Sequence, residues 1–218
     1  MPVQALVIVD VQNDFLPGGA LAVQEGNQII PRINELVKLP FDVIVATKDW
    51  HPANHGSFAS NQGKLVGEVI MLNGIQQILW PAHCVQGSYG SELSHDLDTS
   101  HFEKIFYKGV DQGIDSYSCF FDNGHRQSTG MEDYMKKKHV NKVYIAGLAT
   151  DYCVKYSVFD ALQLGFDTYV IEDVCRGVDI QANDCRLAIE EMKKGGAHII
   201  KSDELFINKE RIFSRKSG

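Results

Sequence analysis

Six short apolar runs, separated by amphipathic stretches, dominate the pattern of this chain of 218 residues. The runs are rich in β-branched residues and cover residues 5–9, 42–47, 104–107, 142–146, 168–171 and 198–200. Continuous apolar runs of this length are typical of parallel strands buried on both faces, and the helices that connect such strands cover the sheet. The pattern therefore predicts a three-layer α/β/α fold around a six-stranded, mainly parallel sheet.

Four amphipathic stretches predict the helices of the outer layers. Asn27 can cap the first helix, and T-G-M-E at residues 129–132 has the form of a capping box at the start of the second. A third helix follows Asp151, with Thr150 and Asp151 as candidate caps. The fourth covers about residues 181–194 and is expected to end at the two glycines that come next.

Residues 52–103 interrupt this alternation with a stretch rich in Gly, Asn and His that shows little periodicity. Loops of this length inside a compact domain are usually functional. The length of the chain fits one domain, and the sequence shows no linker, internal repeat or low-complexity segment. We therefore expect a single domain over residues 1–212, followed by a short tail at residues 213–218.

The net charge and the cysteine pattern indicate which binding partners and which cellular compartment to expect. Acidic residues (28) outnumber basic residues (21), so the field of the protein repels polyphosphates and argues against a nucleic-acid partner. No apolar run approaches the roughly 18 residues of a membrane-spanning helix, and the amino terminus does not have the pattern of a signal peptide. Five cysteines without a C-x-x-C pair are typical of free thiols in a reducing compartment. We expect a cytoplasmic protein that acts on a small molecule, and the sequence leaves homo-oligomerisation open.

Polar residues follow the predicted strands where their carboxyl ends form one crevice. Asp10 follows the first strand, Lys108 follows the third, and Cys153 lies in the first turn of the predicted third helix. The helix dipole there favours the thiolate, although an isolated cysteine is as often a small buried hydrophobe. A carboxylate near a thiol and an ammonium group can take the thiol proton and return it to a leaving group. Alternatively, Asp10 and Lys108 form a structural ion pair.

A second group of residues has the composition of a metal site. Asp49 and His51 are two residues apart, so in extended backbone their side chains point to the same side. His83, in the long insertion, offers a third ligand, and one carboxylate with two imidazoles suits Zn²⁺, Fe²⁺ or Mn²⁺. His55 is a fourth ligand or a neighbour of the site. The spacing D-x-H with a remote His is a weak motif alone.

Other aromatic and histidine residues have less specific roles. Large aromatics that can wall a pocket for a planar ligand, or simply pack in the core, are Phe15, Trp50, Trp80 and Tyr117. Histidines expected to be ordinary surface or core residues are His95, His101, His125, His139 and His198. Neither set defines a function without further partners.

Five motifs occur in order along nearly the whole chain. They are V-D-V-Q-N-D-F at 9–15, K-D-W-H-P-A-N-H-G-S-F-A at 48–59, W-P-A-H-C-V-Q at 80–86, F-Y-K-G at 106–109 and G-L-A-T-D-Y-C-V at 147–154. Together they resemble the nicotinamidases (pyrazinamidases), within the cysteine-hydrolase family that also contains isochorismatase. The resemblance extends to C-R-G-V at 175–178, and the residues beyond about 207 carry no signal.

The resemblance implies roles for the polar residues. Cys153 would be the nucleophile, Asp10 the general acid and base, and Lys108 the cation beside them. One divalent metal ion, Zn²⁺ or else Fe²⁺ or Mn²⁺, would be held by Asp49, His51 and His83. Some relatives use a histidine at the position of His55 as an additional ligand, and others use water.

The resemblance also implies the surroundings of the thiol. A cis peptide bond is expected between Leu148 and Ala149, and the N–H groups of Ala149 and Cys153 would form an oxyanion hole. Phe15 and Trp80 would stack on a pyridine ring. Tyr117 would lie nearby.

The implied reaction is the hydrolysis of nicotinamide to nicotinate and ammonia through a cysteine thioester, in NAD salvage, with pyrazinamide as a further substrate. Three alternatives remain at this point. The chain could act as an isochorismatase, whose vinyl-ether hydrolysis requires neither the cysteine nor the metal. The metal could be the catalyst, with Cys153 only packed. The chain could also be a non-catalytic module that binds a metal or a pyridine.

Overall fold

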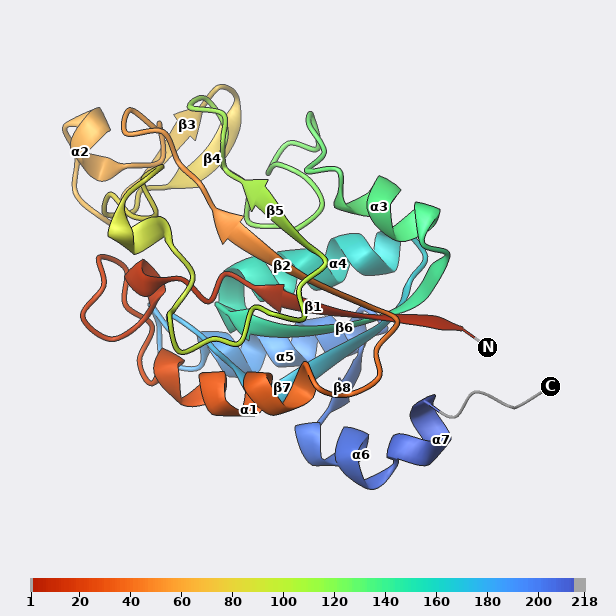
Figure 1. The fold of residues 1–218 in the computed structure, drawn as a ribbon. Coiled ribbons are helices and arrows are strands. Elements are labelled where there is room, and N and C mark those ends of the chain that lie inside the picture. The colour runs from red at the N-terminus through yellow and green to blue at the C-terminus, as the bar shows by residue number, and fades with distance from the viewer. Residues whose placement is uncertain (1, 214–218) are drawn as a thin grey trace.

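The computed structural model describes residues 2–213, and they form a sheet of six strands with helices on both faces (Figure 1). The strands are β1 (Val3–Val9), β2 (Val43–Asp49), β5 (Lys104–Lys108), β6 (Val140–Leu148), β7 (Asp167–Arg176) and β8 (His198–Ile200). Their order is β5-β2-β1-β6-β7-β8, and every neighbouring pair is parallel. The predicted six-stranded parallel sheet is confirmed.

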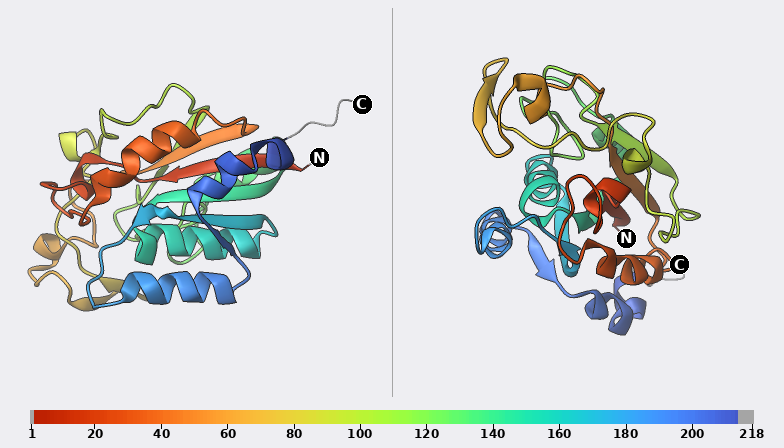
Figure 2. Two further views of the ribbon diagram at one scale, coloured as in Figure 1. Left: turned by 90° about the horizontal axis from the view of Figure 1, so that it is seen from below. Right: turned by 90° about the vertical axis from the view of Figure 1, so that its left-hand side faces the viewer.

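Two hydrophobic layers hold the helices against the sheet, and the three layers are visible from below (Figure 2). One face, which includes Val7 of β1, packs against α3 (Met131–Lys137), α4 (Lys155–Gln163) and α5 (Asp184–Lys194). The opposite face, which includes Leu6 and Ile8, packs against α1 (Ile30–Leu36) and α6 (Ser202–Ile207). None of the helices in residues 2–213 is long and apolar enough to cross a bilayer.

The long insertion contains more regular structure than the sequence analysis predicted. It forms α2 (Ala59–Gln62), the antiparallel strands β3 (Val69–Leu72) and β4 (Ile75–Ile78), and a 3-10 turn at Tyr89–Ser91. Asn73 and Gly74 connect the two strands with φ of 48° and 87°, as a two-residue hairpin turn requires. Asn-Gly between two apolar runs is a known hairpin signal, so this element could have been predicted from the sequence.

The predicted helix caps are largely wrong. Asn27 lies in a 3-10 turn (Gly26–Ile29), and α1 begins after it without a side-chain cap. At α3 the cap residue is Gly130. The Thr129 hydroxyl donates to the carbonyl of Cys119 at 2.6 Å, and the Glu132 carboxylate pairs with Lys136, so no capping box forms. The helix instead begins after Gly130, and the Thr129 hydroxyl accepts the N–H of Met131 at 3.2 Å from the position before the cap.

The remaining helix ends differ less from the predictions. A π-helical turn (Thr150–Val154) precedes α4, and the Asp151 carboxylate accepts the N–H groups of Val178 at 3.0 Å and Asp179 at 2.8 Å instead of capping its own helix. Helix α5 ends before Gly196, whose φ of 109° is left-handed as expected. The last helix, α7 (Lys209–Phe213), includes the first residue of the predicted tail, and residues 214–218 lie outside the described residues.

Candidate active site

The carboxyl ends of the strands bring the predicted catalytic residues together. Asp49 and Lys108 are the last residues of β2 and β5 and are paired in register. Asp10 follows β1 directly with a left-handed φ of 49°, and Cys153 lies in the π-helical turn after β6. Because these strands are parallel, their carboxyl ends share one edge of the sheet, and the four side chains converge there.

Lys108 lies at the centre of this group. Its Nζ is 2.8 Å from Asp10 Oδ2 and 3.3 Å from Cys153 Sγ, and it also forms an ion pair with Asp49. It donates a further hydrogen bond to the carbonyl of Ser116 at 3.0 Å. The lysine and Asp10 are fully buried, and Cys153 is 6% exposed. An ammonium group, a carboxylate and a thiol are therefore in mutual contact away from bulk water.

Burial and charge set the protonation of these groups. Burial raises the pKa of the Cys153 thiol well above its usual value, the Lys108 ammonium lowers it only partly, and Asp10 raises it further. The expectation that the helix terminus favours a resting thiolate is therefore wrong, because the π-helical turn places the sulfur inside the protein. Burial also raises the pKa of Asp10, which makes its carboxylate a stronger base for the thiol proton.

The same carboxylates keep the lysine charged. Burial lowers the pKa of Lys108, but Asp10 and Asp49 outweigh that effect and hold the pKa well above its usual value. Lys108 therefore acts as a fixed positive charge beside the sulfur and not as a proton donor. Negative charge that develops on Cys153 is stabilised by it.

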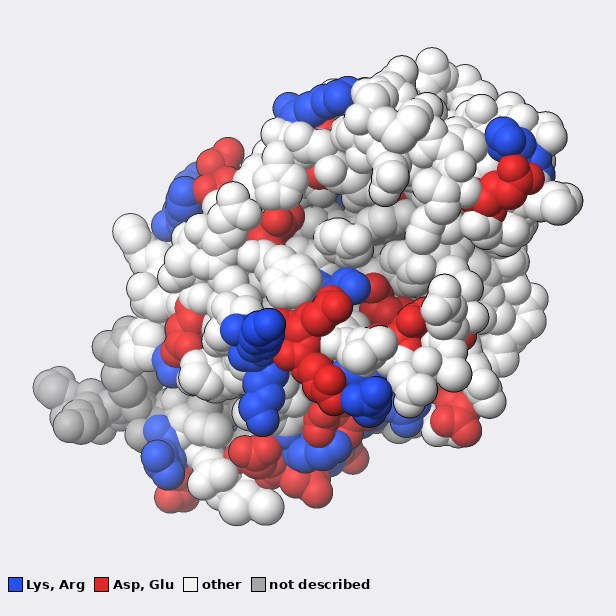
Figure 3. Space-filling model, turned by 180° about the vertical axis from the view of Figure 1, so that it is seen from behind, with Lys and Arg blue, Asp and Glu red and all other residues white. Residues whose placement is uncertain are grey.

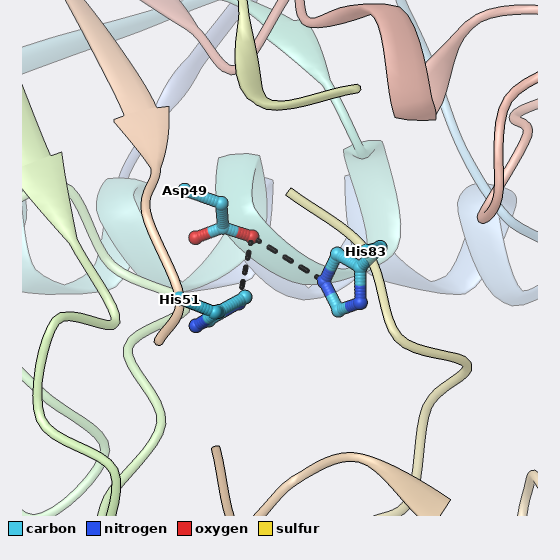
Figure 4. Close-up of side chains that lie close together, drawn as sticks. All are labelled: Asp49, His51 and His83. Carbon is cyan, nitrogen blue, oxygen red and sulfur yellow. Dashed lines mark ion pairs between the residues drawn. The ribbon is translucent and has the colours of Figure 1, made fainter. Parts of the chain in front are cut away.

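The three predicted metal ligands meet beside this group (Figure 4). Asp49 Oδ2 lies 3.6 Å from His51 Nε2 and 3.7 Å from His83 Nε2. The outward nitrogens are held by carbonyls, because His51 Nδ1 is 2.8 Å from the oxygen of Gly109 and His83 Nδ1 is 2.8 Å from that of Pro81. A carbonyl only accepts, so Nδ1 of each ring carries a proton, and Nε2 is the nitrogen directed toward Asp49.

One buried nitrogen in this group lies near carboxylates but makes no hydrogen bond within the described structure. His51 Nε2 is fully buried and accepts no hydrogen bond from residues 2–213. One carboxylate and two imidazole nitrogens that converge within 4.8 Å of one another are the ligands of a divalent transition metal with open positions. The residues therefore fit the predicted metal.

His55 belongs to a neighbouring cluster. Its ligand nitrogen groups with His51 and Asp115 and not with His83. Its Nδ1 is 2.7 Å from the hydroxyl of Ser57, and its Nε2 is 3.3 Å from the carbonyl of Ile114. Both nitrogens therefore have partners within the protein, which favours a role beside the metal group. The sequence analysis missed Asp115, which has no motif around it.

Gly109 is expected to control metal binding, because it leaves no room for a side chain against His51. A Cβ at Gly109 would lie 2.2 Å from His51 Cε1, and the residue has φ of 64°. We expect Gly109→Ala to weaken Zn²⁺ binding at least about tenfold, as measured by calorimetry on the metal-free protein.

Gly63→Ala is the matched control. Gly63 has a similar φ of 60°, but an added Cβ there meets nothing within 4 Å. Both variants carry the backbone cost of alanine at positive φ, and only Gly109→Ala displaces the histidine. Equal Zn²⁺ affinity in the two variants would show that His51 is not a ligand.

A small cavity joins the thiol, the metal group and an aromatic wall. Its volume is about 30 Å³, and its lining residues are Phe15, Leu21, Asp49, Trp80, His83, Asp115, Tyr117, Ala149, Tyr152, Cys153 and Val178. This volume holds one or two water molecules. The predicted pocket residues Phe15, Trp80 and Tyr117 all belong to it.

Other pocket residues differ from the prediction. Trp50 does not line the cavity, because its ring packs against Tyr107 at 5.2 Å with Lys48 over its face. Tyr152 was missed, although it stands next to Cys153 in the sequence and its ring packs against Trp80 at 4.9 Å. Leu21 and Val178 were missed because isolated apolar residues carry no signal of a pocket.

The turn before Cys153 has the expected backbone. The peptide bond between Leu148 and Ala149 is cis, as the resemblance implied. The carbonyl of Ala149 accepts the N–H groups of Tyr152 at 3.1 Å and Val154 at 3.0 Å, which builds the π-helical turn. The use of the N–H groups of Ala149 and Cys153 as an oxyanion hole stays a prediction.

None of the other four cysteines, and none of the histidines assigned no function, lines this cavity. All five cysteines are free thiols, and the five histidines assigned no function are exposed. On the face opposite to that of Figure 1, side chains of both signs are interspersed (Figure 3). Surface ion pairs such as Lys201 with Glu172 at 2.6 Å and Lys155 with Glu191 at 3.3 Å place opposite charges next to each other. A groove of about 1010 Å³ is lined by none of the candidate catalytic residues.

Known proteins share this chain's sequence and fold. A model of the isochorismatase domain family matches residues 4–204. The nicotinamidase of Escherichia coli K12 is 47% identical over 90% of this chain and 94% of its own length. The structure of the Acinetobacter baumannii nicotinamidase/pyrazinamidase has a TM-score of 0.90 at 44% identity and covers 94% of this chain and 99% of its own. That of the Pyrococcus horikoshii pyrazinamidase in complex with zinc has a TM-score of 0.74 at 37% identity, covering 92% and 99%.

Proposed function

This chain belongs to the isochorismatase family, as its motifs predicted, and we propose that it is a nicotinamidase that hydrolyses nicotinamide to nicotinate and ammonia. One observation carries the proposal. A thiol in contact with a buried carboxylate and an ammonium group shares a cavity with two residues of the metal group and with the rings of four aromatic residues, Phe15, Trp80, Tyr117 and Tyr152. The high identity to nicotinamidases over nearly the whole chain supports the same reaction.

In the first half of the reaction, Cys153 attacks the carboxamide carbon. The thiol proton passes to Asp10 as the carbon–sulfur bond forms, so that no free thiolate is needed at rest. Lys108 stabilises the negative charge near sulfur, and the N–H groups of Ala149 and Cys153 would donate to the oxyanion. Asp10 then returns the proton to the departing nitrogen, which leaves as ammonia and leaves a thioester on Cys153.

Water completes the reaction. Asp10, now a carboxylate again, takes a proton from a water molecule that attacks the thioester carbon. The carbon–sulfur bond breaks, the thiol recovers its proton and nicotinate is released. Burial of Asp10 suits both steps, because it raises the pKa of the carboxyl group, so the carboxylate accepts a proton more readily than an exposed one does.

A metal ion held by Asp49, His51 and His83 would supply a Lewis acid for the ring nitrogen. Zn²⁺ is the ion we propose, because the ligand set suits it and a related pyrazinamidase was crystallised in complex with zinc. The aromatic side chains of Phe15 and Trp80 then hold the ring. Together, the metal group and these two rings would orient the carboxamide over Cys153.

Benzamide tests this assignment, because it has the carboxamide of nicotinamide but no ring nitrogen. We expect kcat/KM for benzamide to be at least about 100-fold below that for nicotinamide, measured by ammonia release. Chelation should lower kcat/KM for nicotinamide, yet leave the alkylation rate of Cys153 by iodoacetamide within about twofold.

Three outcomes would contradict this assignment. Benzamide as good a substrate as nicotinamide would remove the ring-anchoring role of the metal group. Equal losses for both amides on chelation, with Cys153 dispensable, would make the metal the catalyst. Turnover of a vinyl ether in place of either amide would favour the isochorismatase reaction.

The wider setting follows from the reaction. Nicotinate released from nicotinamide can re-enter NAD synthesis, so we propose a role in NAD salvage. Pyrazinamide differs from nicotinamide by one ring nitrogen and fits the same anchoring, and the related nicotinamidase/pyrazinamidase supports it as a second substrate. Five free thiols favour the cytoplasm as the compartment.

A further inference from the structure

The two oxygens of the Asp10 carboxylate have different partners. Oδ2 lies 2.8 Å from Lys108 Nζ, the atom that also contacts Cys153 Sγ at 3.3 Å. Oδ1 accepts a hydrogen bond of 2.7 Å from the hydroxyl of Thr47, a buried residue of β2 that is 1% exposed. The mechanism requires only Oδ2, and it assigns nothing to Thr47.

All the hydrogen bonds of the Thr47 hydroxyl within residues 2–213 are with Asp10 and Cys119. Its single hydrogen goes to Asp10 Oδ1, because a carboxylate oxygen only accepts. Its lone pairs face the backbone N–H of Asp10 at 3.3 Å and Cys119 Sγ at 3.8 Å. Thr47 therefore contacts both the main chain and the side chain of Asp10. Asp10 has a φ of 49°, which is rare for an amino acid other than glycine.

Further hydrogen bonds connect Cys119, which contacts Thr47, to the nucleophile Cys153. The Ser157 hydroxyl accepts the N–H of Cys119 at 2.8 Å and donates to the carbonyl of Cys153 at 2.6 Å. Cys119 thus stands between Thr47 and Ser157, with its sulfur 2.9 Å from the Ser157 hydroxyl. One buried chain of contacts connects the base to the backbone of the nucleophile.

We propose that Thr47 is a positioning residue for the reaction assigned above: it fixes Asp10 so that Oδ2, and not Oδ1, receives the thiol proton. Without the hydroxyl, Asp10 Oδ1 is buried without a hydrogen-bond donor. The carboxylate then lowers its free energy by rotating Oδ1 toward the Lys108 ammonium, which moves Oδ2 away from the Cys153 sulfur. The inference rests on the proposed function for its role in turnover, but the geometry of the base and the thiol can be tested without any substrate.

Thr47→Val removes the hydroxyl and keeps the shape, and Thr47→Ser keeps the hydroxyl. We expect Thr47→Val to lower kcat for nicotinamide about 10- to 100-fold with KM within about twofold, and Thr47→Ser to restore most of the loss. The alkylation rate of Cys153 by iodoacetamide should fall in the same order, because Asp10 no longer takes the proton.

Thr168→Val is the matched control. Thr168 is also a buried strand threonine, 1% exposed, but its hydroxyl donates to the carbonyl of Phe166 at 2.9 Å, away from the cavity. The Thr168→Val variant should be less stable than the native protein, with kcat and the alkylation rate of Cys153 unchanged. Zn²⁺ content is measured in all variants to show that the metal group is intact.

A double-mutant cycle separates positioning from a general structural role. In an Asp10→Asn background, Thr47→Val should change the alkylation rate by less than about twofold, because the base that it positions is already absent. Multiplying losses, a native kcat for Thr47→Val, or an equal loss in Thr168→Val would overturn the proposal. If the chain hydrolyses no nicotinamide, but alkylation still follows this pattern, the proposed function fails and the role of Thr47 stands.

Discussion

Cys153→Ala is expected to lower nicotinamide turnover at least about 10⁴-fold, the largest effect of any single substitution in this chain. An amide is attacked slowly by water, and no other thiol lines the cavity. The variant should fold and keep its metal, since Cys153 Sγ is not among the three atoms of the predicted metal group. Ammonia release under saturating nicotinamide measures the loss.

Cys175→Ala is the matched control for the thiol. Cys175 is a free, buried cysteine in β7, 4% exposed, and burial raises its pKa to about 12. Its removal should leave kcat unchanged and affect only stability. Turnover by Cys153→Ala within about tenfold of native would exclude the thioester and favour the metal as the catalyst.

Asp10→Asn and Lys108→Met are each expected to lower kcat by about 100-fold or more, because the first removes the base and the second removes the fixed charge beside sulfur. The double variant should be little worse than the worse single variant, since both residues act on one proton transfer. Steady-state kinetics of the four enzymes measure the cycle. Losses that multiply would mean that the two residues do not act as a unit.

Stability provides the control for this pair. Lys108→Met leaves two buried carboxylates without their shared cation and should destabilise the fold by roughly 3–5 kcal/mol. Combining it with Asp10→Asn removes one of those charges and should restore part of the loss. Lys142→Met, at a partly exposed ion pair with Asp167 of 2.9 Å, should change neither kcat nor stability appreciably.

The architecture and the chemistry-bearing residues could be predicted because each depends on a local pattern. Buried parallel strands are apolar throughout, and the residues just after them, such as Asp10 and Asp49, must meet at one edge of the sheet. Thr129 shows where this reasoning fails. Its sequence pattern predicts a capping box, but Gly130 takes the cap position with a left-handed φ of 84°, so the helix begins one residue later than the pattern indicates.

Two further features depend on packing that no local pattern contains. The direction of the Cys153 pKa follows from how deeply the π-helical turn buries the sulfur, and the first turn of a helix was predicted to do the opposite. Asp115 lines the cavity from a loop without a motif, and its carboxylate accepts a hydrogen bond of 3.0 Å from Gln77, a residue distant in sequence. Such residues can be found only once the tertiary contacts are known.

Trapping the thioester on Cys153 gives a direct test of the proposed reaction. The enzyme is mixed with nicotinamide, quenched in acid within one turnover, digested and analysed by mass spectrometry. The account predicts a nicotinoyl group on the peptide that contains Cys153, absent after the Cys153→Ala substitution and absent when nicotinamide is omitted. Steady ammonia release with no nicotinoyl group on any cysteine, or with the group on another residue, would contradict it.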